Sequence, residues 1–176
     1  MKKIKNTLGV EVNYQDFNLV VDPNCSFEDY GWTKENVEEM LYIEKYELEV
    51  EDVKNDSELF NDLAIIYHDA IGVERNMEKA IKYFEHSVSL DNDLARSNLA
   101  DIYRKGMWGV DKDLKRAFEL YKECKLPYAY YRVGEAYEYG RGVKQDVDAA
   151  KFNYRVAYKT GHPLARKKLK TFDFLK

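Results

Sequence analysis

Hydrophobic and polar positions follow a helical pattern from about residue 57 to residue 170. Apolar residues recur at intervals of three or four residues, as at Ala129, Val133, Ala136 and Tyr137. This spacing places the four side chains on one face of a helix. Ala150 and Tyr154, four residues apart, mark a second helix further along the chain. The pattern predicts two helices that pack against each other as a helical hairpin.

The same arrangement occurs three times. Three pairs mark the turns: Gly72-Val73, Gly109-Val110 and Gly142-Val143. The seventh residue after each Val is alanine and the eleventh is aromatic: Ala80 with Phe84, Ala117 with Tyr121, Ala150 with Tyr154. The third residue after each Val is predicted to cap the following helix with its side-chain oxygen: Asn76, Asp113 or Asp146. A single hairpin cannot bury its apolar face, so the hairpins are expected to stack into a solenoid.

These motifs resemble the Sel1-like repeat family, relatives of tetratricopeptide repeats with a longer turn marked by Gly-Val. The stretch Ala129–Ala150 follows the family pattern almost throughout, whereas Ala70-Ile71 stands where the first turn glycine is expected. The resemblance implies an all-α fold, a short right-handed α-solenoid of three helix-turn-helix repeats. The repeats are expected at about 57–93, 94–127 and 128–162, with a capping helix at 163–172.

Residues 1–56 precede the repeats and are expected to form an N-terminal arm and a helix. Thr33 is predicted to cap a helix over about 34–47. Residues 8–21 alternate apolar and polar positions in two short runs separated by polar residues. This alternation favours two short strands or an extended arm.

Charge is distributed unevenly along the 176 residues, whose net charge is −4. Residues 28–62 hold 13 acids and three bases, whereas residues 151–176 hold eight bases and one acid. The overall balance argues against a general nucleic-acid or membrane-surface binder. The basic run Arg166–Lys170 is short and lacks interleaved aromatic residues, so we interpret it as a solvated capping helix rather than a phosphate site.

The sequence lacks the common phosphate-binding, nucleophile-elbow and zinc-protease motifs. Cys124 is expected to be a buried, inert thiol, and Cys25 has no neighbouring histidine to act as a base. His68, His86 and His162 occupy three different repeat positions and suggest no common site. We therefore expect a protein without catalytic residues, cofactors or metal ions.

In tetratricopeptide-like solenoids the first helix of each hairpin lines the binding surface, so the resemblance selects the outward residues of these helices. They are Ile65, His68, Asp101, Arg104, Lys105, Tyr131, Glu135, Glu138 and Tyr139. Tyr131 and Tyr139 are either interface anchors or isolated exposed aromatics. Trp108, in the enlarged second turn, either covers the core, which we favour, or is an exposed anchor. Glu38 and Glu39 are added from the acidic segment.

The expected function is a non-enzymatic protein–protein interaction module in the cytoplasm, with another protein, basic in charge, as its partner. By analogy within the family, one use is an immunity-type inhibitor that neutralises a basic toxin domain. The alternative is an intracellular scaffold or signalling adaptor that binds another protein through the concave face of the solenoid. The acidic segment favours the inhibitor, because a basic toxin would be attracted to it.

Overall fold

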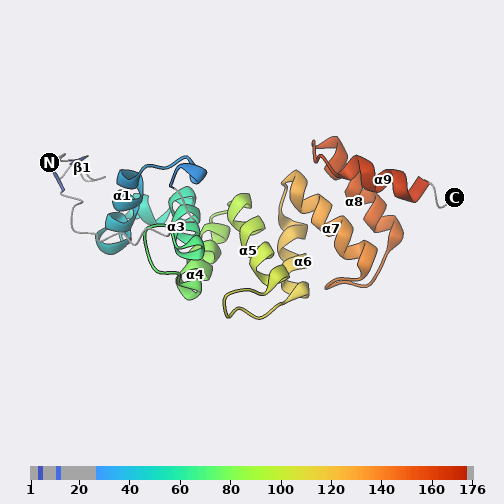
Figure 1. The fold of residues 1–176 in the computed structure, drawn as a ribbon, viewed down its shortest axis with the longest axis horizontal. Coiled ribbons are helices and arrows are strands. Elements are labelled where there is room, and N and C mark those ends of the chain that lie inside the picture. The colour runs from blue at the N-terminus through green and yellow to red at the C-terminus, as the bar shows by residue number, and fades with distance from the viewer. Residues whose placement is uncertain (1–3, 6–10, 13–26, 174–176) are drawn as a thin grey trace. The chain divides into compact units, whose positions relative to one another are not determined.

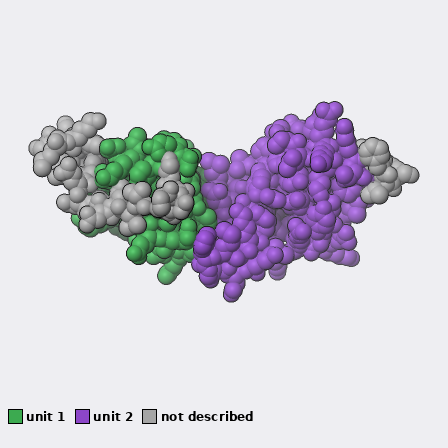
Figure 2. All heavy atoms as spheres, viewed as in Figure 1, with its two compact units in different colours: residues 1–92 green, residues 93–176 purple. Residues whose placement is uncertain are grey.

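The computed structural model describes residues 4–5, 11–12 and 27–173, and nearly all of them lie in helices or in the turns between helices (Figure 1). The chain divides into two compact units, residues 1–92 and residues 93–176, here called unit 1 and unit 2 (Figure 2). The all-helical repeat fold expected from the sequence is confirmed.

Unit 1 contains the N-terminal elements and the first hairpin. Its elements are β1 (Ile4–Lys5), β2 (Glu11–Val12), the 3₁₀ helix η2 (Phe27–Tyr30), α1 (Lys34–Tyr46), α2 (Glu51–Lys54), α3 (Ser57–Asp69) and α4 (Met77–Ser89). The two short strands pair antiparallel, with Ile4 opposite Val12. Residues 11–12, which belong to the first of the two predicted strands, thus form a strand. The second predicted strand, at 17–21, lies outside the described residues. Thr33 caps α1 in a reciprocal capping box with Asn36, as predicted.

Unit 2 contains two further hairpins and a final helix. Its elements are α5 (Asp93–Lys105), α6 (Leu114–Glu123), α7 (Pro127–Tyr139), α8 (Val147–Lys159) and α9 (Ala165–Asp173). Helices α5 and α6 form one hairpin and α7 and α8 the next, while α6 packs on α7 and α9 packs on α8. The helix expected at 163–172 begins two residues later, because Pro163 and Leu164 form the turn before it.

All three hairpins close their turn with the same backbone hydrogen bond. The N–H of the capping residue donates to the carbonyl of a tyrosine on the preceding helix, over 2.8–3.0 Å: Asn76 to Tyr67, Asp113 to Tyr103 and Asp146 to Tyr137. The side chain of each capping residue accepts a backbone N–H three residues ahead. The predicted caps are therefore present, and each fixes both ends of its turn.

The first turn keeps this geometry although it lacks the expected glycine. Ala70 has a φ of 62°, close to the 64° of Gly140 at the equivalent position of the third hairpin. Both residues end their helix in the left-handed conformation. A side chain in this conformation is strained because its Cβ approaches the neighbouring carbonyl. The departure from the family pattern changes the strain in the turn and leaves its path unchanged.

Small residues allow the paired helices to approach closely, as the repeat pattern predicts. A Cβ added to Gly134 on α7 would lie 2.8 Å from the ring of Tyr154 on α8. Tyr154 is fully buried among small residues, Ala150, Ala157 and Ala165. The ring of Tyr154 thus fills the space that glycine and alanine leave between α7, α8 and α9.

Candidate protein-binding surface

Within each unit, half-buried carboxylates join neighbouring helices by accepting hydrogen bonds from tyrosine hydroxyls. In unit 1, Glu44 on α1 accepts hydrogen bonds from Tyr67 at 2.5 Å and from Tyr83 at 2.6 Å. The ammonium of Lys79 lies 2.7 Å from the same carboxylate. Burial, followed by the hydrogen bond to Glu44, raises the pKa of both tyrosines above their ordinary value. Both hydroxyls therefore stay protonated and act as donors.

In unit 2 the first such acceptor is Asp101 on α5. Tyr121 donates to it at 2.5 Å and Tyr128 at 3.0 Å, and Arg104 forms an ion pair with it at 2.9 Å. Burial by itself would raise the pKa of Asp101, but the hydrogen bonds from Tyr121 and Arg104 outweigh it, so that the pKa lies below its ordinary value. Asp101 therefore joins α5, α6 and α7 as an ionised acceptor.

The second acceptor in unit 2 is Glu138 on α7. It accepts a hydrogen bond from Tyr154 on α8 at 2.5 Å and pairs with Lys168 on α9 at 2.8 Å. Burial opposes ionisation, but the bonds from Lys168 and Tyr154 prevail and lower the pKa of Glu138. Lys168 is the main polar link between the last hairpin and the capping helix.

The tyrosine–carboxylate contacts give a structural reason for the many tyrosines in the chain, and sequence reasoning missed them. The missed members include Glu44, Tyr128 and Lys168. A signal for Glu44 was present, because it lies three residues after Leu41 and seven after Val37, on the helix face that carries these two buried side chains. An acid on an apolar helix face points to a buried partner. No such periodic signal identifies Lys168.

Several residues predicted to contact a partner are engaged inside unit 2. Asp101 and Glu138 are the acceptors described above, and Glu135 pairs with Arg132 at 2.6 Å. The side chains of Glu135 and Glu138 are each 18% exposed. Arg104 bonds to Asp101 and Tyr121, and Lys105 lies 3.9 Å from Asp101. These charges stabilise the helices before any partner is considered.

The expected exposure of Tyr131 is wrong. Its ring is 7% exposed and stacks on His162, with the ring centres 4.3 Å apart. His162 lies in the turn between α8 and α9 and covers the ring of Tyr131. Tyr131 therefore belongs to the core. Tyr139 is 49% exposed, and its ring lies under the charged groups of Arg141 and Lys168.

On α3, the first helix of the hairpin in unit 1, the residues predicted to contact a partner are partly covered. Ile65 is half-buried, and His68 contacts Asp69 at 2.7 Å. Asp69 also accepts a hydrogen bond from Tyr30 on η2. The segment before the repeats therefore covers part of the α3 surface that was expected to face a partner.

The acidic segment 28–62 divides into internal and external carboxylates. Glu44 and Glu47 are 10% and 3% exposed, and Glu38 pairs with Lys34 at 3.4 Å. Glu39 is half-buried. Other acids lie on the outside of unit 1, among them Asp29, Glu49, Asp52 and Glu58. The acidic surface is smaller than the sequence count suggested, and it extends over several elements of one unit.

A hollow of about 410 Å³ opens in unit 1, and one of these acids, Glu49, lines it. Its apolar and aromatic lining comes from Leu48, Phe60, Tyr83 and His86, and its charged lining from Glu49, Lys54 and Lys82. His86 lies against Phe60, with ring centres 4.0 Å apart, and its Nε2 is 2.7 Å from the carbonyl oxygen of Lys54. The hollow combines aromatic walls with charges of both signs.

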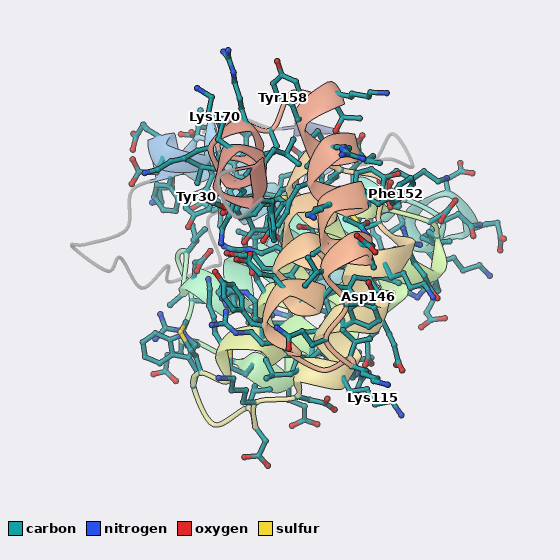
Figure 3. All side chains as sticks on the ribbon, turned by 90° about the vertical axis from the view of Figure 1, so that its right-hand side faces the viewer. Tyr30, Lys115, Asp146, Phe152, Tyr158 and Lys170 are labelled. Carbon is teal, nitrogen blue, oxygen red and sulfur yellow. The ribbon has the colours of Figure 1, made fainter. Side chains whose placement is uncertain are left out.

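Unit 2 presents a different surface, with exposed aromatic and basic side chains. Phe152 and Tyr158 on α8 are 64% and 48% exposed, and Lys170 lies on α9 (Figure 3). Trp108, which was expected to cover the core, is 55% exposed and has a φ of 59°. The enlarged turn between α5 and α6 carries this ring outward, so the favoured interpretation of Trp108 as core cover is wrong and the exposed alternative agrees with the structure.

Among the described residues, cysteine and metal-ligating side chains were the remaining candidates for chemistry. Cys124 is 1% exposed, and burial raises the pKa of its thiol. Within the described ranges, no cluster of three histidine, cysteine or carboxylate side chains is placed to hold a metal ion. None of the helices that the structure describes has the length and apolar character of a membrane span.

Comparison with known proteins gives a consistent result. The model of the Sel1 repeat family matches residues 61–92, 93–123 and 127–162, more than half of the chain. A Schizosaccharomyces pombe protein named as an ERAD-associated E3 ubiquitin-protein ligase component is 31% identical over 84 residues. That match covers 46% of this chain and 12% of the relative, so it spans a small part of the relative's length.

Solved structures show the same repeat architecture. A Sel1 repeat protein from Oxalobacter formigenes is 28% identical, with a TM-score of 0.64 over 73% of this chain and 98% of that one. A protective antigen of uropathogenic Escherichia coli has a TM-score of 0.67 at 16% identity, over 75% of this chain and 28% of that one. Cysteine-rich protein B of Helicobacter pylori has a TM-score of 0.57 at 21% identity, over 79% and 98% of the two chains. The last two likenesses concern the fold alone.

Proposed function

Because the chain belongs to the Sel1 repeat family, whose repeats mediate protein–protein interactions, we propose that it is a non-enzymatic binding module for a basic protein. The observation that carries the proposal is the set of external carboxylates in segment 28–62, among them Asp29, Glu49, Asp52 and Glu58. A field of one sign attracts a partner of the opposite sign and raises its association rate. Segment 28–62 is the proposed contact region.

The hollow beside Leu48 and Phe60 complements these charges. Protein interfaces combine an apolar centre with a polar rim, and aromatic side chains frequently anchor them. An apolar side chain of the partner would enter the hollow while neighbouring lysine or arginine residues approach Glu49 and Asp52. The acidic surface would then set the association rate, and the hollow would set the lifetime of the complex.

Within this proposal the favoured use is an immunity-type inhibitor that acts in the cytoplasm on a basic toxin domain. A toxin that cleaves nucleic acid is basic because its substrate is a polyanion. An acidic inhibitor surface would be complementary to the substrate-binding face of such a toxin. The support for this use is the external acidity of unit 1.

The second use is a scaffold or signalling adaptor within a larger assembly. The supporting observation is the relative named as a component of a ubiquitin ligase. An adaptor of this kind would bind through the first helices of its hairpins, where the candidate residues with exposed or half-buried side chains are Ile65, His68, Lys105 and Tyr139.

Affinity capture of partners from the native cell, followed by mass spectrometry, tests the class of partner. The association rate of the captured protein is then measured at low and at high salt. We expect a basic partner whose association slows by at least about tenfold as salt rises. An acidic partner, or a rate that does not change with salt, contradicts the proposal.

A pair of matched variants locates the contact. The test variant reverses Asp29, Glu49, Asp52 and Glu58 to Lys in unit 1. The control reverses four exposed acids of unit 2, Asp111, Glu119, Glu123 and Asp148, and changes the net charge by the same amount. We expect the test variant to slow association much more than the control at equal thermal stability. Equal effects would mean that total charge acts without a defined surface.

The two uses are separated by the activity of the captured partner. If the partner degrades nucleic acid, an inhibitor abolishes that activity at one equivalent, and an adaptor leaves it unchanged. The measurement is partner turnover with and without the full chain.

A further inference from the structure

Unit 2 contains a small hollow in which three arginines converge. It has a volume of about 30 Å³ and lies where the end of α5, the helix α6 and the last turns of α7 meet. Its apolar wall consists of Leu114, Ala117, Phe118 and Ala136, and its polar lining of Arg104, Arg132, Arg141, Tyr121 and Glu135. The hollow is distinct from the external carboxylates of unit 1 and from the hollow beside Phe60.

Two of the three guanidinium groups have an internal counter-charge. Arg104 pairs with Asp101 at 2.9 Å, and Arg132 pairs with Glu135 at 2.6 Å. Arg132 is also held over the ring of Tyr128, 4.7 Å from its centre. These contacts fix two guanidiniums at the hollow and neutralise their charge.

Two groups at the hollow remain unsatisfied. The Nε atom of Arg132 is buried and has no hydrogen-bond partner. An N–H group removed from water without an acceptor is unfavourable, and native proteins rarely leave one in this state. Arg141, in the turn after α7, is exposed and lies over the ring of Tyr139 at 4.7 Å, with no carboxylate among the described residues in ion-pair range. The hollow therefore keeps one uncompensated positive charge, and an orphaned donor is buried in its wall.

We propose that this hollow binds the carboxylate of an aspartate or glutamate side chain from an acidic segment of a partner protein. A carboxylate offers two oxygens in the plane that guanidinium donors favour, so it can pair with the exposed guanidinium of Arg141. The methylene groups of the same side chain would pack on the apolar wall beside Phe118. Glu135 stays paired with Arg132, and its negative charge disfavours a ligand that carries two negative charges.

The charge of the hollow selects a carboxylate over a phosphate. A volume near 30 Å³ exceeds the roughly 10–15 Å³ that one water molecule needs, so the hollow has room for a small anionic group. One uncompensated positive charge matches a monoanion. The inference concerns unit 2 and does not rest on the acidic surface proposed for unit 1, so either can fail alone.

The test follows the arginine Nε–H signals of the full chain by ¹⁵N NMR during titration at constant ionic strength. The probes are acetyl-Glu-amide, its neutral counterpart acetyl-Gln-amide, and inorganic phosphate. We expect the Arg132 and Arg141 signals to shift and saturate with the glutamate probe and to stay in place with the glutamine probe. The single side chain should bind weakly, in the millimolar range.

A variant pair gives the result a matched control. Arg141→Gln removes the uncompensated charge from an exposed turn and should weaken binding of the glutamate probe at least tenfold. Arg155→Gln, at an exposed position on α8, should leave binding unchanged. Equal shifts with both amide probes, or shifts that spread over all arginines without saturation, would show that the hollow holds only water. Tighter binding of phosphate than of glutamate would overturn the assignment to a carboxylate.

Discussion

The two units carry opposite net charges, but the same kind of contact stabilises the interior of each unit. Unit 1 has 21 acidic and 9 basic residues, whereas unit 2 has 11 acidic and 19 basic residues. In both units a half-buried carboxylate accepts hydrogen bonds from tyrosine hydroxyls and pairs with a cation: Glu44 in unit 1, Asp101 and Glu138 in unit 2. The comparison shows that the polar contacts inside the units are independent of the charge on their surfaces.

The units differ in where the carboxylate originates. Glu44 comes from α1, outside the repeats, whereas Asp101 and Glu138 lie on first helices of repeats at positions that are not equivalent. The aromatic residue at the repeat position on the second helix of each hairpin is Tyr121 or Tyr154 in unit 2. In unit 1 this residue is Phe84, which has no hydroxyl, and the neighbouring Tyr83 donates the hydrogen bond instead. The first repeat therefore depends on the helix that precedes it.

The largest expected effect is on the core of unit 2. Tyr154→Ala should lower the free energy of unfolding by about 3–5 kcal/mol, because it removes a fully buried ring and leaves a cavity between α7 and α9. Tyr158→Ala, on the same helix and 48% exposed, is the control and should change stability by less than about 0.5 kcal/mol. Urea unfolding followed by circular dichroism measures both. Equal midpoints for the two variants would contradict the assignment of Tyr154 to the core.

The next effect tests whether the hydroxyl–carboxylate contacts are equivalent in the two units. Tyr83→Phe in unit 1 and Tyr121→Phe in unit 2 each remove one hydrogen bond to a carboxylate and keep the ring. Tyr121→Phe also removes the oxygen that accepts a hydrogen bond from Arg104. Each should cost about 1.5–3 kcal/mol, the usual contribution of a hydrogen bond to a charged group. The check is the urea midpoint of each variant at neutral pH. A large cost in one unit and none in the other would show that surface charge does affect these contacts.

A smaller effect is expected from the left-handed turn residues. Ala70→Gly should stabilise the first turn by about 1 kcal/mol, because glycine adopts a φ near 62° without strain. Gly140→Ala should destabilise the third turn by a similar amount. Thermal melting of the two variants measures the pair. Changes of the same sign would mean that the two turns are not equivalent.

The smallest effect concerns pH and has opposite signs in the two units. The pKa of Asp101 is lowered in the fold, so its contribution to stability is present above the unfolded pKa and is lost as pH falls through the folded pKa. The pKa of Asp62 in unit 1 is raised by burial and by Glu58 and Asp56, so its contribution is lost as pH rises. Each change should be roughly 0.2–1 kcal/mol.

Stability measured between about pH 3 and pH 7 distinguishes the two signs. Asp101→Asn should make the loss of stability at low pH shallower, and Asp62→Asn should raise stability at neutral pH. Asp148→Asn, at an exposed position, is the control. A stabilising Asp101→Asn at pH 7 would refute the assignment of that carboxylate as an ionised acceptor.

The sequence by itself determined the helices, the caps and the turns. Asp146 acts within a few residues of its own position by capping α8, and Gly140 does so by adopting the left-handed conformation that ends α7. Such local requirements recur at fixed intervals, so a pattern that repeats three times predicts them. At Ala70 the sequence departs from the pattern, and the structure shows that the turn keeps the same hydrogen bond, from Asn76 to Tyr67.

Only the tertiary structure decided which carboxylates are internal and which face outward. Glu44 meets Tyr83 across 39 residues and Glu138 meets Lys168 across 30, and neither separation follows from a repeat. Tyr131 has the spacing of an outward residue, but His162 from the following turn covers it. The helical spacing of a residue does not by itself decide whether its side chain is buried. Burial depends on the neighbours that folding brings together from distant parts of the chain.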